Sequence, residues 1–311
     1  MRIILLGPQR RPTLDRVVRS LFTGPDSAGP VATITAGWQE REPDDAELTA
    51  HLSAALHGGH AVNLGLYRRW LDVQDRDPKY FAGARALADV LAGLQEVYLL
   101  RLDYALRAVY AVQRRSASGD AVPDAVAAVR ELDTEHLRRV NVARREFFDR
   151  LAPHERPVIA EHRAEVSAVL ADAPALVVTG GHVGVLAEVL HLFNVAAALN
   201  GAPVIAWSAG AMALADRIVL FHDRSPQGPG HAEVYGSGLS LLRDVVLLPH
   251  ARARLLLDDT ARMAVFARRF APARCVLLEA GTRIDVSPDG AWPPGVRVLG
   301  EDGHVTAREA A

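Results

Sequence analysis

The sequence is poor in cysteine and in lysine, and each shortage excludes kinds of functional site. Its one cysteine, Cys275, rules out an intrachain disulfide and a cysteine-rich zinc site. Its one lysine, Lys79, lies in the charged segment 75–79. The chain therefore has no Gly-Lys pair for a phosphate-binding P-loop and no good candidate for Schiff-base chemistry.

The chain also lacks an excess of positive charge and a long apolar segment. Its 35 basic and 37 acidic residues give a net charge of -2, whereas nucleic-acid-binding surfaces are usually basic. No apolar run approaches the ~20 residues of a membrane-spanning helix, and segment 1–7 is too short for the core of a signal peptide. We therefore predict a cytoplasmic protein with neither nucleic acid nor membrane as a partner.

Short aliphatic segments alternate with amphipathic helical segments, a pattern typical of a mostly parallel sheet with helices on both faces. The expected strands are 2–6, 31–35, 61–64, 175–179, 203–207, 218–221, 245–248 and 275–279, then a terminal pair, 283–286 and 296–299, around a turn. The expected helices are roughly 12–23, 44–57, 183–199, 209–216 and 252–270. We predict a single α/β domain over residues 1–311.

Residues from about 78 to 151 interrupt this alternation. The segment shows no convincing strand, and its apolar residues recur at helical spacing on both sides of a polar connection at 115–120. We interpret it as a helical hairpin inserted into the α/β domain. Its candidate roles are a lid, a dimer arm that makes a homodimer, a partner site, or a passive element packed on the domain.

Ser208 is the strongest functional signal in the sequence. It follows the buried strand segment 204–207 and precedes the small residues 209–215. Ligands bind at the carboxyl ends of parallel strands, and small residues let strand and helix approach closely at a nucleophile elbow. The N–H of Ala209 would then face the oxyanion formed in acyl transfer. An ordinary N-cap serine is the alternative interpretation.

A second strand-to-helix turn carries the adjacent glycines Gly180 and Gly181. Adjacent glycines allow the backbone to approach a ligand closely, so either N–H can serve as a second oxyanion donor. The alternative is a dinucleotide-binding loop that includes Gly184. The segment lacks the G-x-G-x-x-G spacing that such a loop requires.

His250 and two carboxylates are the candidates for activating the serine. A serine hydroxyl needs an adjacent base, and His250 follows a buried strand segment. Glu279 ends another apolar strand, where an unpaired carboxylate is costly. Asp223 would instead reproduce the Ser-Asp-His chain order of α/β hydrolases. We favour Glu279, because that family has glycine where this chain has Ala206.

These segments together resemble the peptidase E and cyanophycinase family of serine peptidases. The matching residues, in the family's order, are Gly180-Gly181, 207–211, 238–242, Pro249-His250 with Arg254, and 279–282. The resemblance implies the class I glutamine amidotransferase-like fold, with Ser208 as nucleophile, His250 as base and Glu279 as orienting acid. It also implies cleavage next to aspartyl residues through an ester on Ser208, without a metal or organic cofactor.

The chain departs from that family near the residues that would bind the substrate. His182 replaces the usual asparagine after the glycine pair, Ala251 replaces an aromatic residue, and Leu256 replaces a second arginine. Aspartyl preference is therefore an open expectation. We name His182, Trp207 and Arg254 as substrate-binding candidates, because a guanidinium can hold a carboxylate through two hydrogen bonds.

The sequence thus predicts a serine hydrolase that cleaves small peptides or isopeptides, with a small peptide or amide as its partner. Two alternatives are a non-catalytic binding or assembly protein that kept the fold, and a hydrolase of a non-peptide ester or amide. Amidotransferase chemistry is set aside, because it needs a cysteine at the elbow. We expect no metal site, since His182 and His191 are too far apart in sequence for ligands one helical turn apart.

Overall fold

The computed structural model describes residues 1–9, 14–21, 29–56, 60–115, 121–224 and 230–308. A central sheet of six strands organises it, in the order β10-β1-β5-β4-β2-β3. All adjacent pairs are parallel except β10 and β1. Its strands are β10 (Arg283–Val286), β1 (Ile3–Leu6), β5 (Val204–Trp207), β4 (Leu176–Val178), β2 (Val31–Ile34) and β3 (Ala61–Asn63).

Alternate side chains of β1 enter two separate cores, because successive residues of a strand point to opposite faces of the sheet. Ile4 and Leu6 pack in a core with α1 (Leu14–Leu21) and α2 (Ala46–Ala55). Ile3 and Leu5 belong to the larger core on the other face. The helices that contribute to that core include α3 (Leu66–Arg76), α6 (Pro157–Asp172), α7 (Val183–Leu192), α8 (Val195–Ala198) and α9 (Ala209–Leu214). The predicted mixed α/β fold, with helices on both faces of a mostly parallel sheet, is confirmed.

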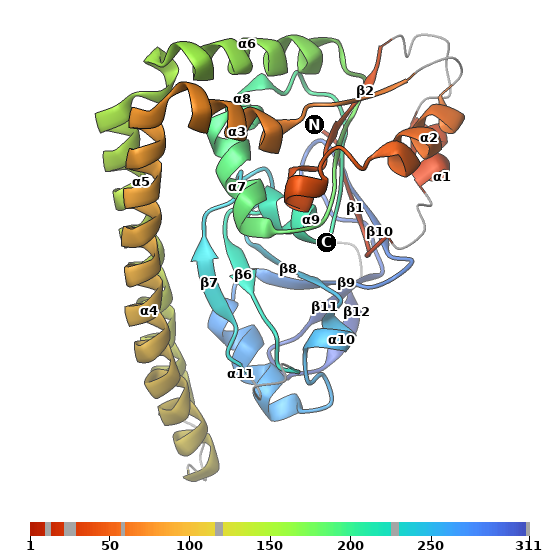
Figure 1. Cartoon of the computed structure of the whole chain (residues 1–311). Coiled ribbons are helices and arrows are strands. Elements are labelled where there is room, and N and C mark those ends of the chain that lie inside the picture. The colour runs from red at the N-terminus through yellow and green to blue at the C-terminus, as the bar shows by residue number, and fades with distance from the viewer. Residues whose placement is uncertain (10–13, 22–28, 57–59, 116–120, 225–229, 309–311) are drawn as a thin grey trace.

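A smaller sheet lies beside the central one, in the order β12-β11-β9-β8 (Figure 1). Its strands are β8 (Val245–Pro249), β9 (Arg274–Leu278), β11 (Val296–Leu299) and β12 (Val305–Arg308). The helices α10 (Ala251–Arg254) and α11 (Thr260–Phe270) connect β8 to β9. After β9, a turn in which the Thr282 N–H donates to the Glu279 carbonyl leads the chain into the central sheet as β10.

The predicted helical hairpin is present as α4 (Pro78–Arg115) and α5 (Ala121–Leu151). The two helices run side by side along one edge of the molecule (Figure 1). The ribbon formed by β6 (Ile218–Leu220) and β7 (Glu233–Gly236) lies next to them. Among the helices of the described ranges, none combines the length and apolar character that crossing a membrane requires.

A buried ion pair fixes the hairpin to the rest of the molecule. Arg269 of α11 donates to both carboxylate oxygens of Asp133 of α5, at 2.6 and 2.7 Å. The same guanidinium donates to the Tyr98 hydroxyl of α4 at 2.9 Å, and that hydroxyl donates to Asp133 at 2.8 Å. Three helices therefore meet at one polar cluster in which each charge has a partner.

Several sequence predictions need correction. The expected pair 283–286 and 296–299 separates: β10 pairs with β1, whose edge would otherwise be open, and β11 joins β9 and β12. The expected helix 183–199 breaks at Asn194, which has φ 52°, and 252–270 divides into α10 and α11. The sequence prediction missed α3, α6, β7 and β12. Residues 116–120 of the expected connection, and both ends of the expected helix 12–23, lie outside the described residues.

Candidate active site

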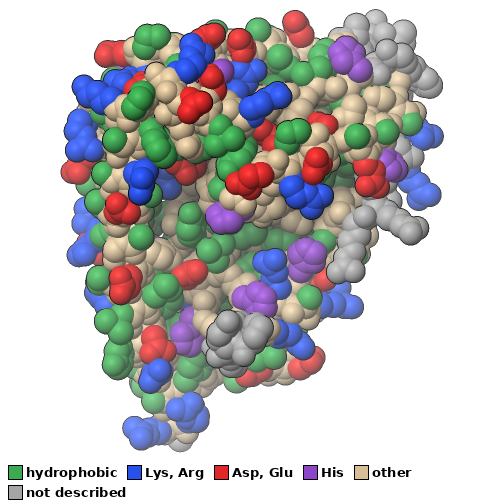
Figure 2. Space-filling view, viewed as in Figure 1, with side chains coloured by type: hydrophobic (Ala, Val, Ile, Leu, Met, Phe, Trp, Pro, Cys, Tyr) green, Lys and Arg blue, Asp and Glu red, His purple; other side chains and the backbone are tan. Residues whose placement is uncertain are grey.

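The carboxyl ends of four neighbouring central strands and of β8 surround one cavity of about 660 Å³. On the face shown in Figure 2, the molecule is hollowed at mid-height, with hydrophobic side chains between histidines and charged groups. The described residues that line the cavity are Pro8, Gln9, Leu14, Gly37, Trp38, Arg41, Asp44, Glu47, Leu48, Gly180, Gly181, Val183, Trp207, Ser208, Ala209, Met212, Leu220, Pro249, His250 and Arg254. Most of the predicted site residues are among them.

Ser208 occupies a strained backbone conformation at the junction of β5 and α9. Its φ of 50° and ψ of -124° lie in a region that L-residues rarely adopt, at a cost of about 1–3 kcal/mol. The surrounding structure holds the strain: β5 is paired on both sides, with β1 and with β4, and the Ser208 carbonyl accepts the Met212 N–H at 3.1 Å. This sharp turn leaves the half-buried serine facing the cavity.

Glycines around Ser208 allow backbone segments to approach closely. A Cβ at Gly210 would lie 2.4 Å from the Thr179 carbonyl oxygen and 2.5 Å from that of Val178. A Cβ at Gly180 would lie 2.9 Å from the Ser208 Cβ and 3.6 Å from its Oγ. The loop after β4 thus lies directly against the serine side chain, which is the approach that the paired glycines predict.

The second glycine of that loop joins it to the loop after β2. Gly181 has φ 124°, and a Cβ there would lie 2.2 Å from the Gly37 carbonyl oxygen. That same oxygen accepts the N–H of His182 at 2.7 Å. Because these backbone contacts join the two loops closely, the part of the cavity wall that they form has little room to shift.

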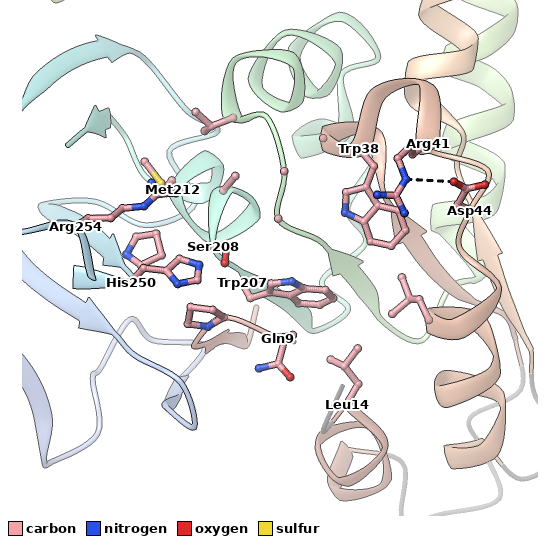
Figure 3. Close-up of a pocket in the computed structure, with 18 of the residues that line it drawn as sticks. Gln9, Leu14, Trp38, Arg41, Asp44, Trp207, Ser208, Met212, His250 and Arg254 are labelled. Carbon is pink, nitrogen blue, oxygen red and sulfur yellow. Dashed lines mark hydrogen bonds and ion pairs between the residues drawn. The ribbon is translucent and has the colours of Figure 1, made fainter. Parts of the chain in front are cut away.

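His250 is held in the left-handed conformation at the end of β8, with φ 57° and ψ 32°. Its N–H donates to the Leu278 carbonyl at 3.1 Å, and its own carbonyl accepts the Arg254 N–H at 3.0 Å. In Figure 3 the imidazole points toward the hydroxyl of Ser208, although the two residues come from different sheets. The structure therefore brings the predicted nucleophile and base to the same cavity.

Glu279 lies next to His250 in the register of β8 and β9. Pro249 and Leu278 are register partners in these parallel strands, so the following residues are neighbours as well. Glu279 is half-buried, and its Oε1 accepts the Arg252 N–H at 2.8 Å. Its side chain is not among the described groups that line the cavity. The register therefore makes residue 279 a backbone neighbour of residue 250.

Asp223, the competing acid, has its carboxylate engaged elsewhere. It is buried, with Oδ1 at 2.6 Å from Nη2 of Arg262, and Oδ2 accepts the Leu256 N–H at 3.2 Å. It does not line the cavity that contains Ser208.

The three predicted substrate-binding residues lie in different places. Trp207 and Arg254 line the cavity, whereas the exposed His182 does not. The imidazole of His182 instead caps α7, with Nδ1 accepting the Val185 N–H at 3.2 Å. His182 is therefore a capping residue at the start of this helix.

The sequence analysis missed the loop after β2, which forms the far wall of the cavity. It contains Trp38 and an exposed ion pair between Arg41 and Asp44 at 3.3 Å (Figure 3). Gln39 turns this loop with φ 57° and ψ -123°, nearly the conformation of Ser208. The sequence does contain a signal for this loop, because Gly37 and Trp38 follow a buried strand, at the edge where ligands bind in open sheets.

The thiol of the chain's one cysteine is poorly reactive. Burial raises the pKa of the Cys275 thiol to about 12, so it stays protonated at neutral pH and is a poor nucleophile. Over the described ranges, no group of three or more His, Cys, Asp or Glu side chains is arranged to hold a metal ion.

No protein-family model matches the chain, and neither does any curated protein sequence. Among solved structures, the chain is similar to a crystal structure of a peptidase from an acI-B1 Actinobacterium. The two share 14% sequence identity with a TM-score of 0.50, and the match covers 100% of this chain and 94% of that one. At this identity the similarity concerns the fold, a mostly parallel sheet flanked by helices.

Proposed function

We propose that the protein is a serine hydrolase that cleaves small peptides or amides through an acyl-enzyme on Ser208. The observation that carries the proposal is the strained elbow of Ser208, which faces a cavity that also contains His250 and Gly180. The similarity to a peptidase structure supports the fold in which we place this chemistry.

In the proposed reaction, His250 takes the Ser208 hydroxyl proton as Oγ attacks the substrate carbonyl carbon. The oxyanion of the tetrahedral intermediate accepts hydrogen bonds from the N–H of Ala209 and of Gly180 or Gly181. The imidazolium then protonates the leaving amine, and the C–N bond breaks to leave an ester on Ser208. Water, deprotonated by His250, hydrolyses that ester and restores the serine.

We assign the orientation of the imidazole to Glu279. One of its oxygens accepts the Arg252 N–H, which fixes the carboxylate at the start of α10. The second oxygen is the acceptor we assign to the ring N–H of His250. Asp223 is the weaker candidate, because both of its oxygens already accept hydrogen bonds from Leu256 and Arg262.

The cavity fits a small substrate with an apolar part and a carboxylate. The indole of Trp207 and the side chain of Met212 line it on the side of Ser208, and the indole of Trp38 lines its far wall. Arg254 follows His250 by one helical turn and lines the same space, where its guanidinium can hold a carboxylate. An aspartyl residue at the cleaved bond supplies the carboxylate, and an apolar neighbouring residue or leaving group would fill the apolar part; we propose this substrate class.

Backbone strain favours this proposal over a non-catalytic binding protein. A residue that only caps a helix has no need of the Ser208 conformation, which costs about 1–3 kcal/mol; unlike Gln39, which has nearly the same angles, Ser208 carries a hydroxyl and lines the cavity. No comparable feature favours a non-peptide ester over an amide, so a substrate panel has to separate them.

The test compares an Asp-anilide with matched acyl-anilides and acyl esters. We expect turnover of the Asp-anilide, and a loss of at least about 1,000-fold in kcat in Ser208→Ala. Turnover of simple esters alone would replace the peptidase assignment by an esterase one. Turnover that persists in Ser208→Ala would remove Ser208 from the mechanism.

The two carboxylates are compared by Glu279→Gln and Asp223→Asn. We expect Glu279→Gln to lower kcat/KM by about 10- to 10,000-fold, as removal of an orienting acid does. Asp223→Asn should leave kcat/KM nearly unchanged and lower thermal stability, because it removes the charge partner of Arg262. The reverse pattern would transfer the acid role to Asp223.

A further inference from the structure

The outer side of α4 carries a row of exposed apolar side chains. Four of its large hydrophobic residues are exposed by half or more: Val90 53%, Val97 54%, Leu100 61% and Tyr104 66%. Soluble proteins commonly expose single apolar residues, but a continuous row indicates an interaction surface. We call the set Val90, Gly93, Val97, Leu100 and Tyr104 the α4 stripe.

The α4 stripe lies nearly opposite the face by which α4 is attached to the molecule. The buried residues of the helix, among them Tyr98, Leu102 and Leu106, pack into the main core. At the 3.6 residues per turn of an α-helix, the stripe positions fall on the far side of the cylinder. In Figure 1 the hairpin forms one margin of the molecule, and the exposure of Val90, Val97, Leu100 and Tyr104 places this side of α4 outward.

Gly93 in the middle of the stripe indicates close approach by another helix. A Cβ at this position would meet nothing within 4 Å, so no packing within the chain requires glycine there. Glycine inside a helix is destabilising relative to alanine. A partner backbone packed against Gly93 would account for the small residue.

The stripe follows the heptad rule of a two-stranded coiled coil. Val90, Val97 and Tyr104 are seven residues apart and occupy one core position, whereas Gly93 and Leu100 occupy the other. Val90 and Val97 at the first position and Leu100 at the second match the residues that favour parallel dimers, whereas Tyr104 and Gly93 do not belong to that set. The pattern therefore fits an identical helix that runs in the same direction.

The charges beside the stripe select the same arrangement. Asp89, Glu96 and Asp103 line one flank at seven-residue spacing, and Arg101 lies on the other flank. In a parallel pair, Glu96 faces Arg101 of the second copy on both sides of the axis. In an antiparallel pair the acidic flanks would face each other. The acidic flank also argues against an anionic membrane surface as the occupant.

We propose that the protein forms a homodimer through the α4 stripe, with the two α4 helices packed in parallel about a two-fold axis. The occupant of the surface is a second copy of this chain, because one stripe complements itself in apolar register and in flanking charge. The proposal is independent of the chemistry proposed for Ser208.

The first experiment measures the molar mass of the full chain by sedimentation equilibrium. We expect the wild-type chain to be a dimer. We expect Val97→Glu, which buries a charge in the seam, to weaken the dimerisation affinity by at least about 100-fold. Val142→Glu is the matched control, because Val142 is an exposed apolar residue of α5 outside the stripe. A monomeric wild type, or equal weakening by both variants, would overturn the proposal.

The second experiment tests the parallel register by charge exchange. Glu96→Arg and Arg101→Glu should each weaken the dimer, and the double variant should regain most of the affinity, since the pair is restored between copies. Circular dichroism of each variant checks that the helices are intact. A dimer unaffected by both single changes would contradict the assigned register.

A cysteine at the axis gives a direct readout of direction. The native Cys275 is buried, so an exposed cysteine introduced by Leu100→Cys provides the accessible thiol. Under mild oxidation we expect a covalent dimer through position 100, because residues on a two-fold axis meet their own copies. Val142→Cys should give no such product. Equal cross-linking at both positions would indicate random collision and count against the proposal.

Discussion

The Ser208 elbow and the Arg269 cluster are two costly features that the fold handles in opposite ways. At the elbow, an unfavourable backbone conformation faces an open cavity. At the cluster, a guanidinium with a 3% exposed side chain has Asp133, Tyr98 and the Ala232 carbonyl as partners. Strain directed at solvent space is typical of function, whereas a fully paired buried charge is typical of structure.

The same contrast bears on the role of the hairpin. The cluster joins α4 and α5 to α11 through buried charged hydrogen bonds, and moving the hairpin away would leave Arg269 unpaired in the core. An unpaired charge that stays in a partly apolar core is strongly destabilising. Among the roles that the sequence left open, this attachment favours a fixed arm over a lid.

The largest effect should come from removing the Ser208 hydroxyl. We expect Ser208→Gly to lower kcat by at least about 1,000-fold. We also expect it to raise the free energy of unfolding by up to about 1–3 kcal/mol, because glycine adopts the elbow conformation without strain. Kinetics and denaturant unfolding on the same sample measure both. A stability loss would show that the serine is kept for structure.

The next effect concerns the Arg269 cluster. Asp133→Asn leaves a buried guanidinium without its counter-charge, so we expect a loss of about 3–5 kcal/mol in the free energy of unfolding. Glu131→Gln, an exposed carboxylate on the same helix, is the matched control. Turnover per folded molecule should stay unchanged in Asp133→Asn. A fall in kcat with an intact fold would make the hairpin part of the active site.

A smaller effect is expected where the elbow helix touches β4. Gly210→Ala brings a methyl group to 2.4 Å from a backbone carbonyl oxygen, and we expect a loss of about 1–3 kcal/mol from overpacking. Activity should fall as well, because α9 must shift together with Ser208. Gly236→Ala, with its nearest neighbour at 3.9 Å, is the control for glycine replacement. Equal effects of the two changes would deny the close approach.

The smallest effect is a pH dependence at the hairpin. Burial lowers the pKa of His136, which stacks on Tyr98 and faces Asp133 and Arg139. The unfolded chain therefore binds more protons than the folded one once the pH falls below about 6.5. Stability should decline there, and the decline should be shallower in His136→Phe. Unfolding curves at pH 7.5 and 5.5 measure this, and an identical slope in the variant would contradict it.

Features that depend on a strand end could be predicted from the sequence, and features that depend on partners distant in sequence could not. Ser208, Gly180 and His250 each follow a short buried strand, and parallel strands bring such residues to one edge. The preference for Glu279 over Asp223 had one indirect signal in the sequence, the alanine at position 206. The further support comes from Arg262, which reaches Asp223 from another element.

The division of the strands into separate sheets had the same origin. The segments of β10 and β11 look like consecutive strands, and only the open edge of β1 decides that β10 leaves its neighbour. Trp38 was missed for a different reason. The short turn that contains it has neither helical nor strand periodicity, and Gln39 directs it by an unusual backbone conformation that sequence patterns do not encode.

Labelling of the native protein with a fluorophosphonate, followed by peptide mass spectrometry, most directly decides whether Ser208 is the nucleophile. We predict one adduct, located on Ser208, absent from Ser208→Ala and slowed in His250→Ala because the base is lost. An unlabelled native protein, or an adduct that persists at another residue in Ser208→Ala, would contradict the assignment of Ser208.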